Sequence, residues 1–230
     1  MFLDLERLES DIVQLQHEAA GFGTGRLIAD NLILTAAHTL DADDGTGPVQ
    51  GLWQARLERD RGGGPWHFRR CNRVVWCDQE RDLALIKVDE SGHDLLRPAL
   101  RLRVATVSRA NRHSVEARGY PRASKQAEGR ELTPAHGVLT AAGRDRPLRF
   151  GVDRCDLPNE PHADWPGMSG SSVLLEDAPA EDEIWIYGVV QSVPVNFDGQ
   201  LRVARLDDAW GHGRRATSPI RRQPTPSLSV

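Results

Sequence analysis

One stretch constrains the fold of this chain more than any other: GMSGSS at residues 167–172, followed by the apolar run 173–175. The glycines on either side of Ser169 predict a tight turn that presents a hydroxyl group just before a strand, because glycine lets the backbone approach other groups closely. In such a turn the backbone N–H groups of Gly167 and Ser169 could stabilise the anion that forms on a carbonyl oxygen during acyl transfer. Glycine-serine turns are also common in inert loops, so the motif needs support from elsewhere in the chain.

Two further motifs supply the partners that a reactive serine needs. A serine hydroxyl is a poor nucleophile at neutral pH, and it requires a base together with a carboxylate that orients the base. The apolar run LILTAAH, residues 32–38, ends at His38, and Asp82 opens the apolar run in RDLALIKV, residues 81–88. We therefore predict that His38 is the general base and acid, that Asp82 orients it, and that Ser169 is the nucleophile.

Together the motifs resemble those of the trypsin/chymotrypsin-like serine peptidases, in particular the trypsin-like peptidase domains of bacteria. TAAH at 35–38, DLALI at 82–86 and GMSGSS at 167–172 follow the order of that family, at intervals of 82 − 38 = 44 and 169 − 82 = 87 residues. The resemblance implies an all-β fold of two six-stranded antiparallel Greek-key barrels, with a short N-terminal helix and a C-terminal helix or tail. It also implies the three catalytic roles given above and an oxyanion hole formed by the two amides.

The resemblance and the local composition divide the chain into four parts. We expect residues 1–10 to be an N-terminal extension, residues 11–95 to form the first barrel, and residues 96–210 to form the second. The Gly-, Pro- and charge-containing stretch 91–103 provides the connection. Residues 211–230 are rich in Arg, Pro and Ser and cannot bury enough apolar surface to fold, so they predict a disordered tail or a linker.

The resemblance also implies where a substrate binds. An extended substrate backbone would pair with an edge strand, and its side chain would enter a pocket beside it. The residues predicted for this role are Ala163, Asp164, Gln191, Ser192 and Val193. Ala163 stands where family members that prefer basic side chains carry an aspartate. The neighbouring Asp164 would either bias the pocket toward Arg or Lys, or lie in a surface loop beside a pocket for a small or apolar side chain.

One departure from the secreted relatives concerns activation. Many of those relatives become active when cleavage frees an amine that pairs with an aspartate just before the nucleophile. Met168 occupies that position here, so the chain is not expected to use this switch. Its oxyanion hole is then either preformed or ordered by a partner or a substrate. A second departure is Thr39, directly after His38, where secreted relatives usually carry a disulfide cysteine.

Composition limits the partners, the cellular compartment and the cofactors that we expect for this protein. The net charge of −4 excludes a globally basic surface for nucleic acid, and no apolar run reaches the ~18 residues of a membrane-spanning helix. The acidic start of the chain lacks the features of a signal peptide. We expect a cytoplasmic protein with reduced thiols, at Cys71, Cys77 and Cys155. The acidic loop 41–50 lacks the glutamate that closes an EF-hand, and no metal or organic cofactor is predicted.

The sequence therefore predicts a serine endopeptidase that cleaves proteins through an acyl-enzyme. A cytosolic protease must spare its host, so narrow specificity or a gated site is expected, with a bacterial defence or signalling system as the setting. The predicted partners are a protein or peptide substrate and an activating partner or a further domain beyond the tail. The alternative is a catalytically silent trypsin-like module that only binds peptides.

Overall fold

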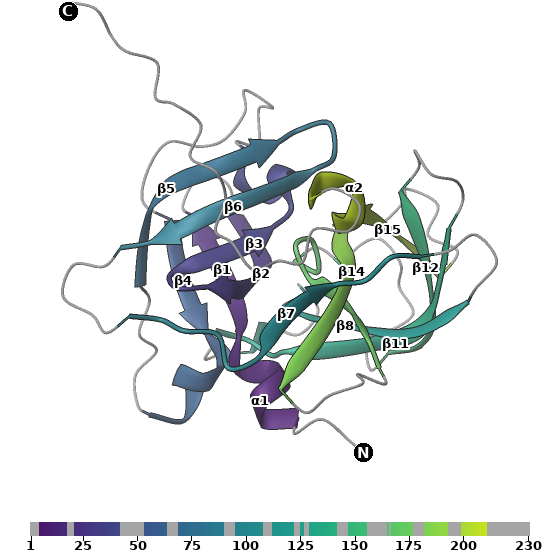
Figure 1. Ribbon diagram of the computed structural model, residues 1–230. Coiled ribbons are helices and arrows are strands. Elements are labelled where there is room, and N and C mark those ends of the chain that lie inside the picture. The colour runs from purple at the N-terminus through teal and green to yellow at the C-terminus, as the bar shows by residue number, and fades with distance from the viewer. Residues whose placement is uncertain are drawn as a thin grey trace, which may run out of the picture.

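The computed structural model shows two β-barrels side by side (Figure 1). It describes residues 5–17, 21–41, 53–63, 69–89, 95–107, 112–121, 125–126, 129–141, 147–155, 165, 167–176, 182–192 and 199–210. The predicted tail, residues 211–230, lies outside the described residues, as do the predicted binding residues Ala163, Asp164 and Val193.

Six antiparallel strands form the first barrel. They are β1 (Ile12–His17), β2 (Gly21–Ala29), β3 (Leu32–Thr35), β4 (Trp53–Leu57), β5 (Arg69–Asp78) and β6 (Leu83–Val88). Their order is β1-β2-β3-β6-β5-β4, and the pairing of β1 with β4 closes the barrel. Leu15, Ile33, Trp53 and Ile86 are among the buried side chains that fill its interior.

The second barrel repeats this connectivity. Its strands are β8 (His113–Gly119), β11 (Thr133–Ala141), β12 (Leu148–Cys155), β13 (Ser172–Leu175), β14 (Glu183–Ser192) and β15 (Gln200–Arg205). They run in the order β13-β8-β11-β12-β15-β14, and β13 pairs with β14 to close the barrel. The prediction of two six-stranded antiparallel Greek-key barrels is thus confirmed. One addition is β7 (Arg101–Val104), which pairs in parallel with β14.

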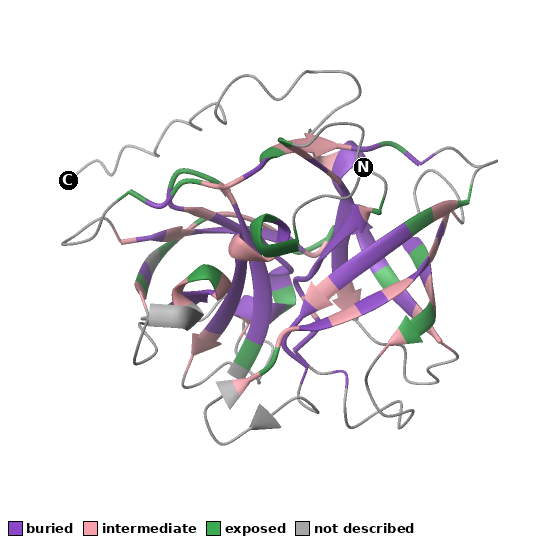
Figure 2. Ribbon diagram, turned by 90° about the horizontal axis from the view of Figure 1, so that it is seen from below, coloured by how far each residue is buried: buried purple, intermediate pink, exposed green. Residues whose placement is uncertain are grey.

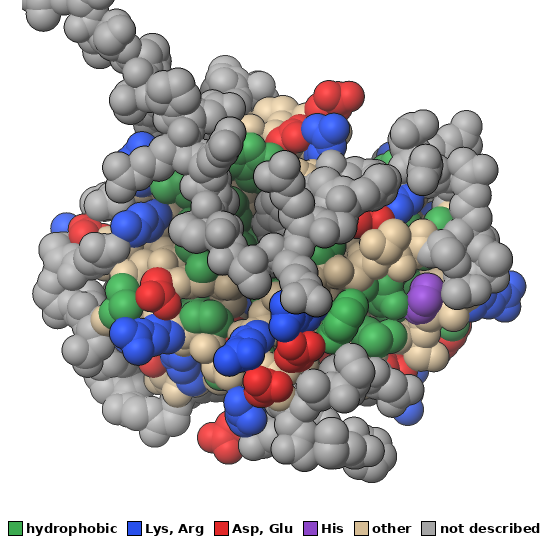
Figure 3. Space-filling view, in the orientation of Figure 1, with side chains coloured by type: hydrophobic (Ala, Val, Ile, Leu, Met, Phe, Trp, Pro, Cys, Tyr) green, Lys and Arg blue, Asp and Glu red, His purple; other side chains and the backbone are tan. Residues whose placement is uncertain are grey.

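Short elements complete the fold. They are α1 (Leu5–Ser10), the 3-10 helices η1 (Ala37–Leu40) and η2 (Glu58–Gly63), the two-residue strands β9 (Lys125–Gln126) and β10 (Gly129–Arg130), and α2 (Leu206–Trp210). Helices thus stand near both ends of the described chain, as expected. Within the described residues, no helix is long and apolar enough to cross a bilayer. Basic and acidic side chains intermingle on the face in Figure 3.

A layer of apolar side chains fills the space between the barrels. Leu34 of β3 and Leu85 of β6 pack there against Leu174 and Ile186 of the second barrel. The neighbour of Leu34 in the chain, Ile33, points into the first barrel instead. Strand β3 is therefore buried on both faces, which explains its continuous apolar run. Figure 2 shows that buried residues extend along the strands of both barrels. The residues just beyond the ends of β3 and β6 consequently lie beside the second barrel.

We predict that the apolar layer between the barrels contributes strongly to stability. Leu34 is fully buried, so Leu34→Ala should lower the free energy of unfolding by about 2–5 kcal/mol, from lost burial and the cavity left behind. Leu5 is 53 % exposed, and the matched control Leu5→Ala should change the free energy of unfolding by less than about 0.5 kcal/mol. Urea unfolding measures both variants. Equal effects would contradict this account of the interface.

Candidate active site

The fold brings the predicted base and acid into contact. His38 lies in η1 just after β3, and Asp82 directly precedes β6. Because β3 and β6 are antiparallel, with Thr35 opposite Ala84, the end of one strand meets the start of the other. The His38 Nδ1 atom lies 2.9 Å from Oδ1 and 2.8 Å from Oδ2 of Asp82. The backbone N–H of His38 also donates to Asp82 Oδ1, at 2.8 Å, so one carboxylate holds both the ring and the main chain of the histidine.

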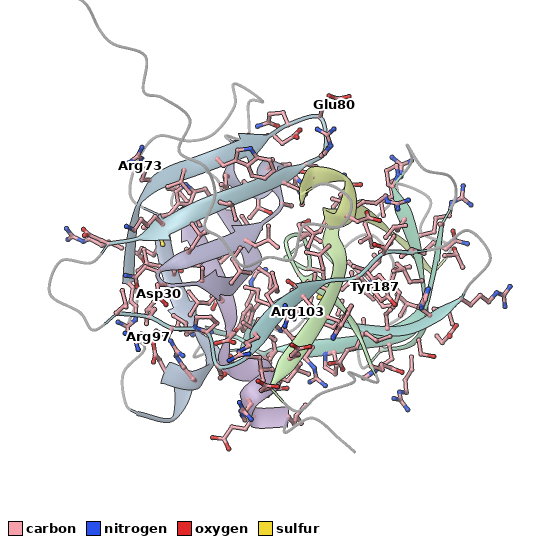
Figure 4. All side chains as sticks on the ribbon, viewed as in Figure 1. Asp30, Arg73, Glu80, Arg97, Arg103 and Tyr187 are labelled. Carbon is pink, nitrogen blue, oxygen red and sulfur yellow. The ribbon has the colours of Figure 1, made fainter. Side chains whose placement is uncertain are left out.

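The turn that carries Asp82 is held from two sides. Asp82 has φ 56, in the left-handed region that aspartate tolerates better than most residues. The side-chain amide of Gln191, on β14, donates to the carbonyl of Arg81 at 3.1 Å and so ties this turn to the second barrel. Glu80, labelled in Figure 4, marks the position of the turn at the end of the β5–β6 hairpin. The Asp82 side chain is 18 % exposed and that of His38 is 42 % exposed, which leaves the ring accessible to a substrate.

The predicted nucleophile stands in a turn just before β13. Its flanking glycines have positive φ, 104 for Gly167 and 87 for Gly170. Between them the Met168 side chain is buried in the core of the second barrel, and its N–H donates to the Trp165 carbonyl at 3.0 Å. Ser169 is partly exposed. The turn is therefore anchored by an apolar side chain at the position where the secreted relatives carry an aspartate.

Strand β2 of the first barrel holds the same turn from the other side. The Thr24 N–H donates to the Ser169 carbonyl at 2.9 Å, and the Thr24 hydroxyl donates to the Gly167 carbonyl at 2.7 Å. The Thr35 hydroxyl in turn donates to the Thr24 carbonyl at 2.7 Å. A Cβ at Gly170 would overlap with that carbonyl, so only glycine fits there. Sequence reasoning did not assign Thr24 to the site, although the glycines at 23 and 25 indicate a close backbone approach.

The two predicted oxyanion donors are both backbone N–H groups of the turn that carries Ser169. Within the described residues, neither the Gly167 N–H nor the Ser169 N–H donates to another group of the protein. Both N–H groups are therefore available as hydrogen-bond donors.

Of the predicted substrate-binding residues, two lie in the described part of β14. Ser192 pairs with Arg202 of β15 on one side of the strand. On the other side, β13 reaches no further than the pair of Ser172 with Val189. In the described part of the chain, the remaining edge at Gln191 and Ser192 has no strand partner, and a peptide could pair there.

Cys77 lies near Asp82 but is a poor candidate nucleophile. Burial raises the pKa of its thiol, and the carboxylates of Asp41, Asp78 and Asp82 raise it further. Because the thiolate is the reactive form, Cys77 stays unreactive at neutral pH. All three cysteines are free. The described residues also contain no group of three or more His, Cys, Asp or Glu that could hold a metal ion.

Packing fixes the segment that follows His38. Thr39 is buried, and a Cβ at Gly23 of β2 would overlap with its methyl group. The missing side chain at Gly23 is thus what lets Thr39 lie against β2. The position after the histidine is held by close contact and not by a disulfide bond.

Comparison with known proteins shows the family and the fold of this chain. Residues 23–178 match the trypsin-like peptidase domain, and the chain belongs to that family. No curated protein matches it. Among solved structures, the thermostable serine protease AL20 from an extremophilic microorganism superposes with TM-score 0.61 at 15 % identity, over 86 % of this chain and 92 % of AL20. Kallikrein-related peptidase 10 gives TM-score 0.57 at 18 % identity (90 % and 96 %), and Deg5 gives 0.57 at 19 % (89 % and 87 %).

We predict that Gly170 is required for the nucleophile turn. Gly170→Ala should lower the free energy of unfolding by about 2–5 kcal/mol, because it adds left-handed strain and a clash with the Thr24 carbonyl. Gly199 provides the control, since it has a similar φ of 81 but a Cβ there would lie 3.8 Å from its nearest neighbour. Gly199→Ala should cost only about 1–2 kcal/mol. Urea unfolding of the two variants tests this, and equal costs would contradict it.

Proposed function

We propose that this protein is a serine endopeptidase with His38, Asp82 and Ser169 as its catalytic triad. The observation that carries the proposal is the contact of both Asp82 carboxylate oxygens with His38 Nδ1, at 2.9 and 2.8 Å. The carboxylate keeps the proton of the neutral imidazole on Nδ1, so Nε2 is left with a free lone pair. That nitrogen can then accept the proton of a serine hydroxyl.

The reaction follows from these roles. Ser169 Oγ attacks the carbonyl carbon of a peptide bond while its proton passes to His38 Nε2. The negative charge on the carbonyl oxygen is stabilised by the N–H groups of Gly167 and Ser169. The imidazolium, stabilised by Asp82, gives its proton to the leaving amine, and the C–N bond breaks. Water, deprotonated by His38, then hydrolyses the acyl-enzyme and restores the serine.

The proposed substrate is an extended protein segment. Its backbone would pair with the free edge at Gln191 and Ser192, and with Val193 as the sequence predicts. Pairing between backbones selects an extended shape more than a particular sequence. The substrate side chain that precedes the cleaved bond would enter the proposed pocket, to which Ala163 and Asp164 are assigned. The preference of this pocket for basic or for small apolar side chains would depend on the direction of the Asp164 carboxylate. We propose a cytoplasmic protease that cleaves few proteins, in a defence or signalling system.

Labelling with a fluorescent fluorophosphonate tests the nucleophile and the base. We expect the wild type to label, and Ser169→Ala and His38→Ala to lose labelling. His136→Ala is the matched control, because His136 Nδ1 also contacts a carboxylate, Glu176 Oε1 at 2.9 Å, but lies outside the proposed triad. That variant should label like the wild type. The assignment would be contradicted if Ser169→Ala were still labelled, or if His136→Ala lost labelling while His38→Ala kept it.

The same probe distinguishes the enzyme from a silent peptide-binding module. A module without an activated serine would stay unlabelled under every condition. A gated enzyme would be labelled once cell lysate supplies its activating partner, and this labelling would still depend on Ser169.

We predict that Asp82→Asn lowers kcat about 10⁴-fold with little loss of stability. Asparagine tolerates the left-handed backbone at this position, and its amide oxygen can still accept the His38 N–H. It cannot hold the ring in the required tautomer, because its NH₂ group donates where the carboxylate accepts. Hydrolysis kinetics and thermal unfolding measure the two effects. A variant with full kcat would remove Asp82 from the triad.

A further inference from the structure

Thr24, a residue of the first barrel, forms two hydrogen bonds with the nucleophile turn. It lies in β2 and is fully buried. Its N–H donates to the Ser169 carbonyl at 2.9 Å, and its hydroxyl donates to the Gly167 carbonyl at 2.7 Å. Both carbonyls belong to the turn that carries the two proposed oxyanion donors. Thr24 takes no part in the chemistry described above, so these contacts call for another role.

The direction of the Thr24 hydroxyl proton is set by its surroundings. The Tyr120 N–H donates to Thr24 Oγ1 at 3.1 Å and so occupies one acceptor site of the hydroxyl. A backbone carbonyl can only accept, so the hydroxyl must direct its own proton at Gly167 O. With one hydrogen bond accepted and one donated, the hydroxyl has a single orientation. The Gly167 carbonyl is held in place as a result.

The peptide unit between Gly167 and Met168 is thereby fixed at both of its polar ends. Thr24 binds its carbonyl oxygen, and the Trp165 carbonyl accepts its N–H at 3.0 Å. The two bonds matter because Gly167 has no Cβ and φ 104, so no side chain of its own restricts rotation of the peptide plane. Without the hydroxyl, one of the two bonds that hold the plane would be lost.

Thr24 also contacts both sides of the peptide unit that follows. The unit between Met168 and Ser169 carries the Ser169 N–H, one of the two donors. Thr24 binds the carbonyl on either side of it, that of Gly167 through the hydroxyl and that of Ser169 through the N–H. A single residue thus holds both flanks of the donor peptide, and both donors are left unpaired within the described residues.

We propose that Thr24 is a positioning residue that fixes the oxyanion hole in its open form. The inference rests on the proposed peptidase function and extends it, since it assigns the shape of the hole to a side chain of the opposite barrel. In this arrangement the hole needs no pairing with a new N-terminal amine. Its geometry follows from docking β2 against the second barrel.

The test compares three variants. Thr24→Val has nearly the same shape but leaves Gly167 O and the Tyr120 N–H without the hydroxyl, whereas Thr24→Ser retains it. Thr35→Val is the matched control, because the buried Thr35 hydroxyl donates to a backbone carbonyl at the same 2.7 Å, but on Thr24 and not on Gly167. The measurements are kcat and KM for a peptide substrate and the inhibition constant of a peptide aldehyde, whose hemiacetal oxygen binds in an oxyanion hole.

We expect Thr24→Val to lower kcat at least tenfold, toward the roughly 10²–10³-fold loss seen when one oxyanion donor is removed, and to leave KM within about twofold. Aldehyde binding should weaken in parallel. Thr24→Ser should restore both values, and Thr35→Val should stay within about threefold of the wild type. Equal losses in Thr24→Val and Thr35→Val, or a Thr24→Val enzyme with full kcat, would overturn the proposal. Thr24→Ala serves in place of the valine variant if that one does not fold.

A measurement that does not depend on enzyme activity tests this proposal separately from the proposed function. Crystal structures of Thr24→Val and Thr35→Val show the Gly167–Met168 peptide directly. We expect the plane to be rotated in the first variant only. If the wild type stays unlabelled by the fluorophosphonate even with added cell lysate, the proposed peptidase function is wrong, and the orientation of the Gly167–Met168 peptide still tests the role of Thr24. An unchanged plane in Thr24→Val would overturn that role.

Discussion

The contact of strand β2 with the turn around Ser169 is the constraint on which the candidate site depends. The site is divided between two barrels, with His38 and Asp82 on the first and Ser169 on the second. Neither barrel can align these residues alone. The apolar layer around Leu34 and Ile186 brings the barrels together, and the hydrogen bonds of Thr24 fix the distance and the direction. A nonspecific force thus supplies the stability, and a few directional bonds supply the alignment.

Polar contacts reinforce the alignment near the N-terminal helix. Arg118 of β8 pairs with Glu9 of α1 at 2.6 Å, and it also pairs with Glu116, its neighbour on β8, at 3.0 Å. Arg26 of β2 is fully buried, which lowers the pKa of its guanidinium to about 10, and it donates to the Leu8 carbonyl at 3.2 Å. Helix α1 is therefore joined to both barrels. It packs Leu8 into the layer between them and helps to hold β2 in place.

Much of this arrangement could be predicted from local sequence, and the rest depends on contacts that leave no local pattern. The apolar runs before His38 and after Asp82 predict buried strands, and the structure has β3 and β6 there. The stretch 122–130 has the polar composition of a loop, yet β9 and β10 pair within it. The role of Thr24 could not be predicted, since its hydroxyl binds a carbonyl 143 residues away in the chain. A side chain with a distant backbone partner produces no periodicity or composition signal.

The packing of Thr39 against Gly23 has a consequence for where such a site can operate. Two strands can be clamped beside a catalytic histidine by a sulfur–sulfur bond, and the clamp then lasts only while the surrounding thiol pool leaves it oxidised. Here a methyl group fills the space that glycine leaves open, and all three thiols of the chain are free. Nothing in this clamp can be reduced. The packing that holds the segment after His38 therefore does not depend on the redox potential around the protein.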